Sequence, residues 1–367
     1  MLLSSLLDHV SQSVIIAGDT NIEVLGVVND SRNVRPGFVF VAIPGVKQNG
    51  ATFAKEAVER GAVALLAEKL LPFDVGAHVV ATDVREALGE MVSAFYSHPS
   101  RSMHMIGVTG TNGKTTVTYF LESILNEAGF STGLIGTIET RYGGISRPST
   151  HTSPDSPELQ CTLKDMREAG VSRCVMELSS HALTLKRPAG CWLDGVGITN
   201  ITHDHLDFHE TWEAYRDSKL QAFELLRHKP NSFVVANMHD QSFAHVQDRW
   251  KERLFAFGFA APAEIRLTSS KALDVGNELH IMTPGGKLTA TTQLPGAHNI
   301  ANALTAVGLA YAAGVGLEPI KLGLEKLERV PGRFQYVRGK RFLGVVDFAH
   351  NPDGLLQLLM TARTLTK

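Results

Sequence analysis

The chain has 367 residues, of which 44% are hydrophobic and 20% are charged, values ordinary for a soluble globular protein of two or three domains. A net charge of −2 gives no electrostatic basis for binding nucleic acid or an anionic membrane, so small molecules are the expected partners. The three cysteines lack metal-ligand spacing, and the start of the chain does not resemble a signal peptide. We therefore expect a cytoplasmic protein, and a monomer.

Residues 1–98 predict a small α/β domain. Apolar runs near 24–28, 39–43 and 63–67 are typical of strands, and helices are expected near 52–60 and 84–97. The polar turn Asn29-Asp-Ser-Arg32 follows the first of these strands. Such a turn is either an ordinary strand end or part of a ligand-binding rim, and the sequence leaves both readings open.

The next domain opens with a glycine-rich turn, Gly110-Thr-Asn-Gly-Lys-Thr-Thr116, after an apolar strand. Gly110 and Gly113 lack Cβ atoms, so backbone N–H groups can close around an anion there. Lys114 supplies a positive charge, and Thr115 offers a hydroxyl group to Mg²⁺. The turn therefore predicts a phosphate-binding loop.

The loop departs from the strict glycine patterns for mononucleotides and dinucleotides, because position 108 is Val108. The Lys-Thr pair decides between them, since it suits a nucleoside triphosphate with Mg²⁺, whereas a dinucleotide turn needs no lysine. Apolar spacing from Val117 to Ala128 predicts a helix that ends before Gly129. The phosphates would then lie at the N-terminus of that helix.

Two later segments combine strands with possible metal ligands. A strand expected over 173–179 puts Glu177 near its carboxyl end, where a Mg²⁺ ligand or a capping glutamate would both fit. Another strand runs into Asn200-Ile-Thr-His-Asp-His-Leu-Asp-Phe-His209. His203 and His205 are two positions apart and would point away from each other on a helix, which disfavours a zinc site.

A helix expected over 212–226 carries Lys219 on its apolar face, four positions after Tyr215. A lysine there is either a structural residue that extends to solvent or a buried amine whose pKa is lowered, which makes it nucleophilic. Asn299 and Asn302 share one face in the first turn of a later helix, and the sequence leaves open whether they cap that helix or serve a site.

Residues 332–367 predict only a strand near 342–347 and one helix. These two elements cannot bury a core of their own. We therefore expect residues 332–367 to be the beginning of a third domain, after a central domain over 99–331.

Together these motifs resemble the Mur ligase family, ATP-dependent enzymes that add amino acids to the muramoyl peptide of bacterial cell-wall precursors. The matching motifs, in family order, are Gly110–Thr116, Met176–Leu183, Thr199–Asp207, Lys219, Gly296–Asn302, Gly332-Arg333 and Val346–Asp353. The resemblance implies a UDP-binding N-terminal α/β domain, a central P-loop domain with a parallel sheet, and the start of a Rossmann-like C-terminal domain. The N-terminal motifs are most similar to those of the ligases that add the third residue.

The resemblance also implies roles for individual residues. ATP would be bound by Gly110, Thr111, Asn112, Gly113, Lys114, Thr115, Thr116, Asn299, Asn302, Arg333 and Asp347. Magnesium would be held by Thr115, Glu177, His205 and Lys219, with Lys219 carbamylated, and Lys114, Glu177, His205 and Lys219 would be catalytic. The sugar-peptide substrate would be contacted by Ser31, Thr152, Ser153, Ser179 and Arg187.

The reaction implied is phosphorylation of the terminal carboxylate of UDP-N-acetylmuramoyl-L-alanyl-D-glutamate by ATP. The amine of an amino acid, meso-diaminopimelate or L-lysine, would then attack the acyl phosphate and form an amide. Two alternatives remain from the sequence alone. One is a folylpolyglutamate-type or cyanophycin-type ligase, and the other is a module that binds a nucleotide or a UDP ligand without turnover.

Overall fold

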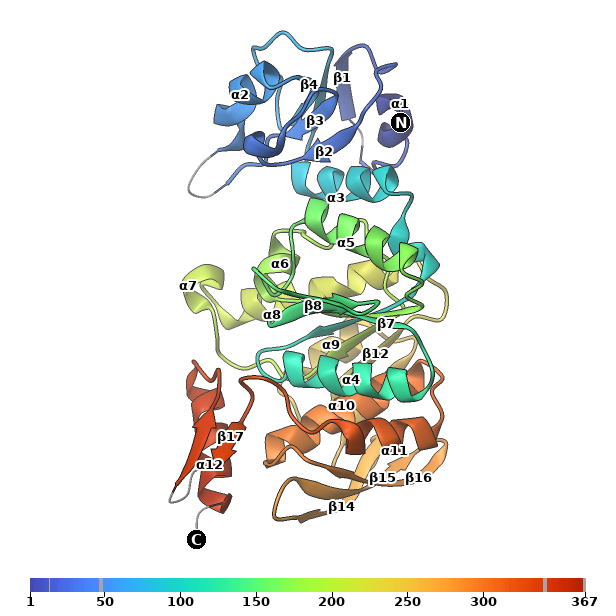
Figure 1. Cartoon of the computed structure of the whole chain (residues 1–367), viewed down its shortest axis with the longest axis vertical. Coiled ribbons are helices and arrows are strands. Elements are labelled where there is room, and N and C mark those ends of the chain that lie inside the picture. Colours follow the sequence, from blue (N-terminus) through green and yellow to red (C-terminus); the bar gives the residue numbers. More distant parts are fainter. Residues whose placement is uncertain (13, 46–48, 339–341, 366–367) are drawn as a thin grey trace. The chain divides into compact units, whose positions relative to one another are not determined.

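The computed structural model of the chain describes residues 1–12, 14–45, 49–338 and 342–365. These residues form two compact units (Figure 1). Unit 1 comprises Met1–Ser102, Pro154–Arg167 and Thr184–Cys191. Unit 2 comprises Met103–Ser153, Glu168–Leu183 and Trp192–Lys367. The α/β class expected from the sequence is confirmed, and its parallel-sheet core lies in unit 2.

Unit 1 is built on a five-stranded sheet with the order β1-β5-β4-β3-β2. The strands are β1 (Val14–Gly18), β2 (Gly26–Val28), β3 (Phe38–Val41), β4 (Ala62–Ala67) and β5 (Ala77–Ala81). Strands β2 to β5 are parallel, and β1 pairs with β5 in the antiparallel direction. The sequence patterns anticipated β2, β3 and β4 but not β1 or β5. Four of the five residues of β1 are exposed, so this edge strand lacks the buried alternation that marks a strand.

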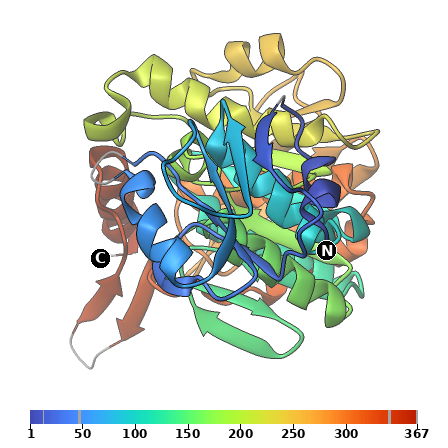
Figure 2. The ribbon, with the colours of Figure 1, turned by 90° about the horizontal axis from the view of Figure 1, so that it is seen from above.

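Helices cover both faces of this sheet (Figure 2). The helices of unit 1 are α1 (Leu3–Leu7), α2 (Ala54–Glu59), α3 (Val84–Phe95) and α5 (Ser156–Glu168). One apolar cluster joins α1 and α3 to the sheet through Leu6, Leu88 and Met91. A second cluster packs Ala54 and Ala57 of α2 against the opposite face. The Asp83 side chain accepts hydrogen bonds from the N–H groups of Arg85 and Glu86 in the first turn of α3, which explains why that helix begins there.

Unit 2 contains an eleven-stranded sheet with the order β16-β15-β14-β13-β12-β11-β6-β10-β7-β8-β9. Its parallel strands are β6 (His104–Thr109), β7 (Thr132–Ile135), β10 (Arg173–Glu177), β11 (Gly195–Ile198), β12 (Phe233–Asn237), β13 (Leu254–Gly258) and β14 (Ile265–Ala272). Antiparallel strands extend both ends, namely β8 (Glu139–Tyr142), β9 (Ile145–Pro148), β15 (Asn277–Thr283) and β16 (Gly286–Thr292). Because β10 and β11 both flank β6, their carboxyl ends meet beside the phosphate loop.

One face of this sheet is covered by three helices that pack together (Figure 1). They are α4 (Lys114–Glu127), α10 (Ala297–Ala312) and α11 (Leu317–Lys326). Phe120 and Ile124 of α4, with Leu304 and Val307 of α10, are fully buried in one extensive apolar cluster. Gly129 follows α4 with φ +80°, so the predicted helix end is confirmed.

The prediction of a single helix over 212–226 is wrong for the second half of that range. The α-helix α8 (Trp212–Leu220) ends before Gln221, and a 3₁₀ segment, η4 (Gln221–Leu226), continues the chain. Phe223 and Leu226 of η4 are still buried, so apolar spacing alone did not distinguish the two helix types. Helix α11 was not anticipated either. Two short helices complete this part of unit 2, α7 (Leu206–His209) and α9 (Phe243–Arg249).

The C-terminal residues form a two-stranded antiparallel ribbon, β17 (Gln335–Arg338) and β18 (Leu343–Val346), followed by α12 (Pro352–Leu365). Helix α12 contacts α10. Residues 339–341 lie outside the described part of the chain. Within the described part, no helix is both long enough and apolar enough to span a membrane.

Candidate nucleotide and magnesium site

The phosphate loop joins the end of β6 to the start of α4. Gly110 has φ +142° and Gly113, the residue before α4, has φ +90°, conformations that side-chain-bearing residues rarely adopt. A Cβ atom at Gly110 would collide with the Thr199 hydroxyl, and one at Gly113 would collide with Asn302 Oδ1. Both glycines are therefore required by conformation and by space, which fits a loop whose backbone surrounds an anion.

The residues just after β11, which neighbours β6 in the sheet, fix the loop from one side. Thr199 Oγ1 donates a 2.6 Å hydrogen bond to the Asn112 carbonyl, and Asn112 N donates to Asn200 Oδ1. The Thr111 amide also donates to the Asn200 carbonyl. These bonds fix the shape of the loop, which reduces the entropy cost of binding phosphate.

Two lysines converge on the same carbonyl oxygen of this loop. Lys114 Nζ donates to the carbonyls of Gly110 and Thr111 at 2.8 and 2.9 Å. Lys219 Nζ donates to the Gly110 carbonyl at 2.8 Å and lies 4.4 Å from the centre of the Tyr215 ring. Lys219 is only 1% exposed. Burial, followed by the charge of Lys114, holds the pKa of Lys219 well below its usual value, so the neutral amine is favoured.

Glu177 ends β10 at the level of Val108 in β6, directly beside the loop. Its side chain is fully buried and accepts a 3.0 Å hydrogen bond from the Thr115 hydroxyl. Arg333 Nη2 in turn donates to Thr115 Oγ1 at 3.0 Å. A hydroxyl and a carboxylate are the hard oxygen ligands that Mg²⁺ prefers, so these two residues fit the expected magnesium site.

His205 lies in a separate group of aromatic contacts. Its backbone is left-handed, with φ +51°, and its ring packs edge-on against His181 at 4.8 Å between centres. Asp204 Oδ2 is 3.8 Å from His205 Nε2. Burial lowers the pKa of His205, which favours the neutral imidazole that a metal needs. In the ranges that the structure describes, no group of three or more His, Cys, Asp or Glu side chains could hold a metal ion by itself.

A cavity of about 540 Å³ opens beside the loop, a volume within the range of small-molecule sites. Asn302 donates to Asn299 Oδ1, which orients both amides along the cavity wall. Asp347 accepts hydrogen bonds from the Phe334 and Ala349 amides. The predicted residues that line this cavity are Asn112, Gly113, Thr116, Asn299, Asn302, Arg333 and Asp347.

Several residues at this site were not singled out from the sequence. Asn200, Asn237 and His239 line the cavity at the carboxyl ends of β11 and β12, where the rule that ligands meet the carboxyl ends of parallel strands would have found them. Asn351 Nδ2 donates to Asp204 Oδ2 at 3.0 Å and also contacts Asn112 of the loop. No local sequence pattern predicts that last contact, because it joins residues more than two hundred positions apart.

The predicted substrate residues divide between the two units. In unit 1, Ser31 Oγ donates to Glu56 Oε2 at 2.8 Å, and Arg187 Nε lies 2.7 Å from Asp155 Oδ1 in a cavity of about 190 Å³. In unit 2, Ser153 Oγ donates to the Glu177 carbonyl at 2.8 Å. The roles of Thr152 and Ser179, the other two predicted substrate residues of unit 2, also stay predictions.

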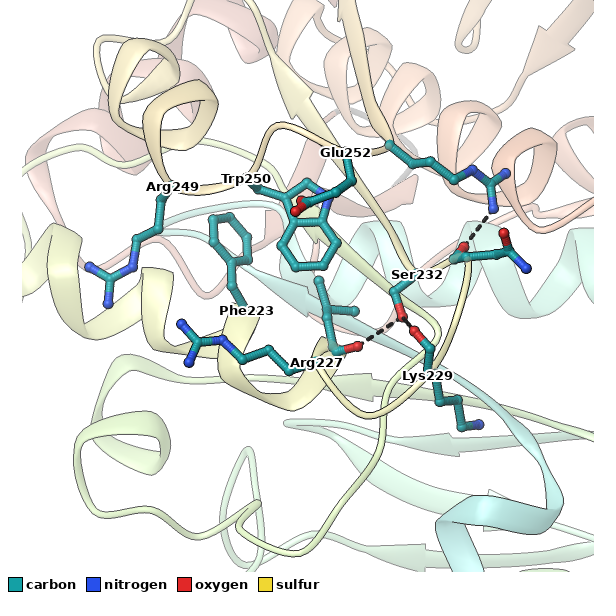
Figure 3. Close-up of a pocket in the computed structure, with 10 residues that line it drawn as sticks. Phe223, Arg227, Lys229, Ser232, Arg249, Trp250 and Glu252 are labelled. Carbon is teal, nitrogen blue, oxygen red and sulfur yellow. Dashed lines mark hydrogen bonds between the residues drawn. The ribbon is translucent and has the colours of Figure 1, made fainter.

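A further cavity of about 530 Å³ lies in unit 2 around Trp250 (Figure 3). Phe223, Leu226 and Trp250 form its apolar part. Its cations already have partners, since Arg227 pairs with Glu224 and Lys229 pairs with Asp194. None of the predicted site residues lines it.

A glycine loop after a parallel strand, a lysine and a threonine at the start of the following helix, and a buried glutamate on the neighbouring strand define a nucleoside-triphosphate-binding α/β protein of the P-loop type. Comparison with known families agrees. The Mur ligase middle domain matches residues 108–310, and the Mur ligase family catalytic domain matches residues 23–96. The chain belongs to the Mur ligase family.

A curated relative from Bacillus licheniformis is named UDP-N-acetylmuramoyl-L-alanyl-D-glutamate--2,6-diaminopimelate ligase. It is 36% identical to this chain over the whole chain, which covers 76% of that protein. A solved structure with the same name has a TM-score of 0.83 at 27% identity, and the match covers 99% of this chain and 74% of that one. The folylpolyglutamate synthase of Mycobacterium tuberculosis, solved with ADP and AMPPCP, matches at a TM-score of 0.63 and 17% identity. That match covers 75% of this chain and indicates a shared fold.

Proposed function

We propose that this chain is an ATP-dependent ligase that adds diaminopimelate to UDP-N-acetylmuramoyl-L-alanyl-D-glutamate in peptidoglycan precursor synthesis. The convergence of Lys114, Lys219 and the Thr115–Glu177 pair on the phosphate loop carries this proposal. The name shared by the relative and the solved structure supports the substrate and the amino acid. L-Lysine is the alternative acceptor.

The residues of the loop would bind and neutralise the triphosphate. Backbone N–H groups of the loop and the charge of Lys114 would hold the phosphates, while Asn299 and Asn302 would lie near the adenine. Arg333 and Asp347 would lie near the ribose and the phosphates. Binding of ATP would have to displace Lys114 Nζ from the Gly110 and Thr111 carbonyls, since the same ammonium group is to reach the phosphates.

Thr115, Glu177, His205 and a carbamylated Lys219 would hold magnesium, which neutralises the charge that builds up on the transferring phosphoryl group. Lys219 suits carbamylation because burial lowers the pKa of its amine, which favours the neutral form, and only a neutral amine can attack CO₂. Carbamylation also turns the amine into an oxygen ligand.

The acceptor substrate would be bound by Ser31, Thr152, Ser153, Ser179 and Arg187. Its terminal carboxylate would attack the γ-phosphorus of ATP, which releases ADP and leaves an acyl phosphate. The amine of diaminopimelate would then attack the acyl carbon and expel phosphate, so one amide forms for each ATP consumed. We expect the enzyme to act in the cytoplasm as a monomer, without nucleic acid or membrane as a partner.

The test is to incubate the chain with ATP, Mg²⁺, UDP-muramoyl dipeptide and either meso-diaminopimelate or L-lysine. Phosphate release and the mass of the UDP-muramoyl product are measured together. The expected result is a mass increase for diaminopimelate and phosphate release that requires all substrates. Glutamate addition to a folate substrate would instead support the folylpolyglutamate alternative, and binding of ATP without any product would support the non-catalytic one.

A further inference from the structure

The turn between β7 and β8 encloses the carboxylate of Glu177. Thr137 N donates to Glu177 Oε1 at 2.8 Å, and Thr137 Oγ1 lies 2.9 Å from Glu177 Oε2. A single residue therefore satisfies both oxygens of a carboxylate that is fully buried. Burying a carboxylate is costly unless its oxygens accept hydrogen bonds, so these contacts offset that cost and fix the orientation of Glu177.

The preceding glycine makes this close approach possible. A Cβ atom on Gly136 would lie 2.5 Å from Glu177 Oε1, so even alanine there would push the carboxylate away from the Thr137 amide. The backbone of Gly136 is not left-handed. Space for the carboxylate, rather than conformation, is therefore the reason for glycine at this position.

The Thr137 hydroxyl also reaches the stretch that we expect to contact the acceptor substrate. Thr152 Oγ1 lies 3.1 Å from Thr137 Oγ1. An ionised carboxylate can only accept, so the single proton of the Thr137 hydroxyl is directed to Glu177. Thr152 must then donate its own proton to Thr137. The next residue, Ser153, donates to the Glu177 carbonyl at 2.8 Å, so Thr152 and Ser153 are both linked to Glu177.

We propose that Thr137 is a positioning residue that orients Glu177 for the metal and couples that carboxylate to the acceptor substrate through Thr152. This inference rests on the proposed ligase function for the identity of the acceptor. Thr115 and Glu177 would give up the hydrogen bond between them if both were to hold a divalent cation. The bonds from Thr137 then remain as the donors that hold the carboxylate in place.

The direct test measures Mn²⁺ affinity by electron paramagnetic resonance in the presence of a non-hydrolysable ATP analogue, so it does not depend on turnover. Thr137→Val keeps the shape but removes the hydroxyl, and Thr137→Ser keeps the hydroxyl. We expect Thr137→Val to weaken Mn²⁺ binding at least about tenfold, the usual effect of losing a partner of a metal ligand, and Thr137→Ser to stay within about twofold. Thr132→Val is the matched control, because the Thr132 hydroxyl bonds only the Phe130 carbonyl among its described contacts.

Gly136→Ala tests the contact between the Thr137 amide and the Glu177 carboxylate by a different change, and it should also weaken Mn²⁺ binding. Thermal unfolding of each variant separates local effects from loss of the fold. Equal Mn²⁺ affinity in Thr137→Val and the unmodified chain would overturn the positioning role, and so would an equal loss in Thr137→Val and Thr132→Val.

The coupling is tested by adding UDP-muramoyl dipeptide to the same Mn²⁺ titration. The dipeptide should tighten Mn²⁺ binding in the unmodified chain and in Thr137→Ser, but not in Thr137→Val. Tightening of the same size in Thr137→Val would overturn the coupling. If no muramoyl product forms in any assay, the ligase proposal fails, while the Mn²⁺ affinities of the variants still decide the role of Thr137.

Discussion

Lys219 and Gly110 are 109 positions apart, yet Lys219 Nζ donates a 2.8 Å hydrogen bond to the Gly110 carbonyl. The lysine comes from α8 and the glycine from the turn after β6. The contact puts a buried amine, with a lowered pKa, against the loop that is expected to hold the phosphates. The residue predicted to be carbamylated is therefore in direct contact with the predicted phosphate loop.

We predict that Lys219→Ala abolishes ligase turnover while the fold is kept. Loss of a carbamate that balances charge at the transferring phosphoryl group should lower kcat at least about 100-fold. A short carboxylic acid added to the assay should restore part of the activity by filling the vacated space. Lys271→Ala, at an exposed position, is the control and should be fully active.

Electron density for Lys219 offers a second measurement. Crystals grown with Mg²⁺, nucleotide and bicarbonate should contain extra atoms on Nζ. An unmodified ammonium group paired with Asp or Glu under these conditions would contradict carbamylation.

Lys114→Ala should remove ATP binding but leave binding of UDP-muramoyl dipeptide within a few-fold. The reason is that Lys114 belongs to the phosphate loop of unit 2, whereas the UDP group is expected to bind the N-terminal domain. Calorimetric titration with each ligand measures both affinities. An equal loss of both affinities in a folded variant would count against two separate sites.

Ser31→Ala should weaken binding of UDP compounds by about 1 kcal/mol, the usual contribution of one hydrogen bond. The Ser31 hydroxyl already donates to Glu56, so its oxygen keeps lone pairs to accept from the ligand. Calorimetry with UDP alone is sufficient. An unchanged affinity would mean that Ser31 only orders the turn at Asn29–Arg32.

We predict that the partly buried His104 makes the folded chain less stable at acid pH. Burial lowers the pKa of His104 to about 4, and Lys229 and Arg173 add to this effect while Asp194 opposes it. Between the model-peptide value of 6.5 and about 4, the unfolded chain therefore binds a proton that the folded chain does not. Stability should be full above pH 6.5 and fall as the pH is lowered towards 4, by up to about 3 kcal/mol from this residue.

The measurement for His104 is the free energy of urea unfolding as a function of pH, for the unmodified chain and for His104→Leu. Carboxylates titrate in the same range in both proteins, so only the difference between the two curves is informative. As the pH falls from 6.5 to 4, the unmodified chain should lose unfolding free energy relative to His104→Leu. Parallel curves would show that His104 is not the cause.

The sequence by itself determined the features that depend on residues close to one another along the chain. The glycines of the phosphate loop, the apolar spacing of α4 and the glycine after it are local signals, and the structure has each element where they indicate. Strands β6, β10 and β11 were likewise visible as apolar runs that end in polar residues. Because parallel strands bring their carboxyl ends to one edge, the sequence could also name Glu177 as a residue of the site.

Only the tertiary structure decided which of these ends are neighbours and what each side chain contacts. The order β11-β6-β10-β7 puts Asn200 on one side of the loop and the Gly136-Thr137 turn against Glu177 on the other. These hydrogen bonds join residues 40 to 88 positions apart, so no local pattern encodes them. Strand β1 was missed for the same reason, since an exposed edge strand is defined by its pairing with β5 and not by its own apolar spacing.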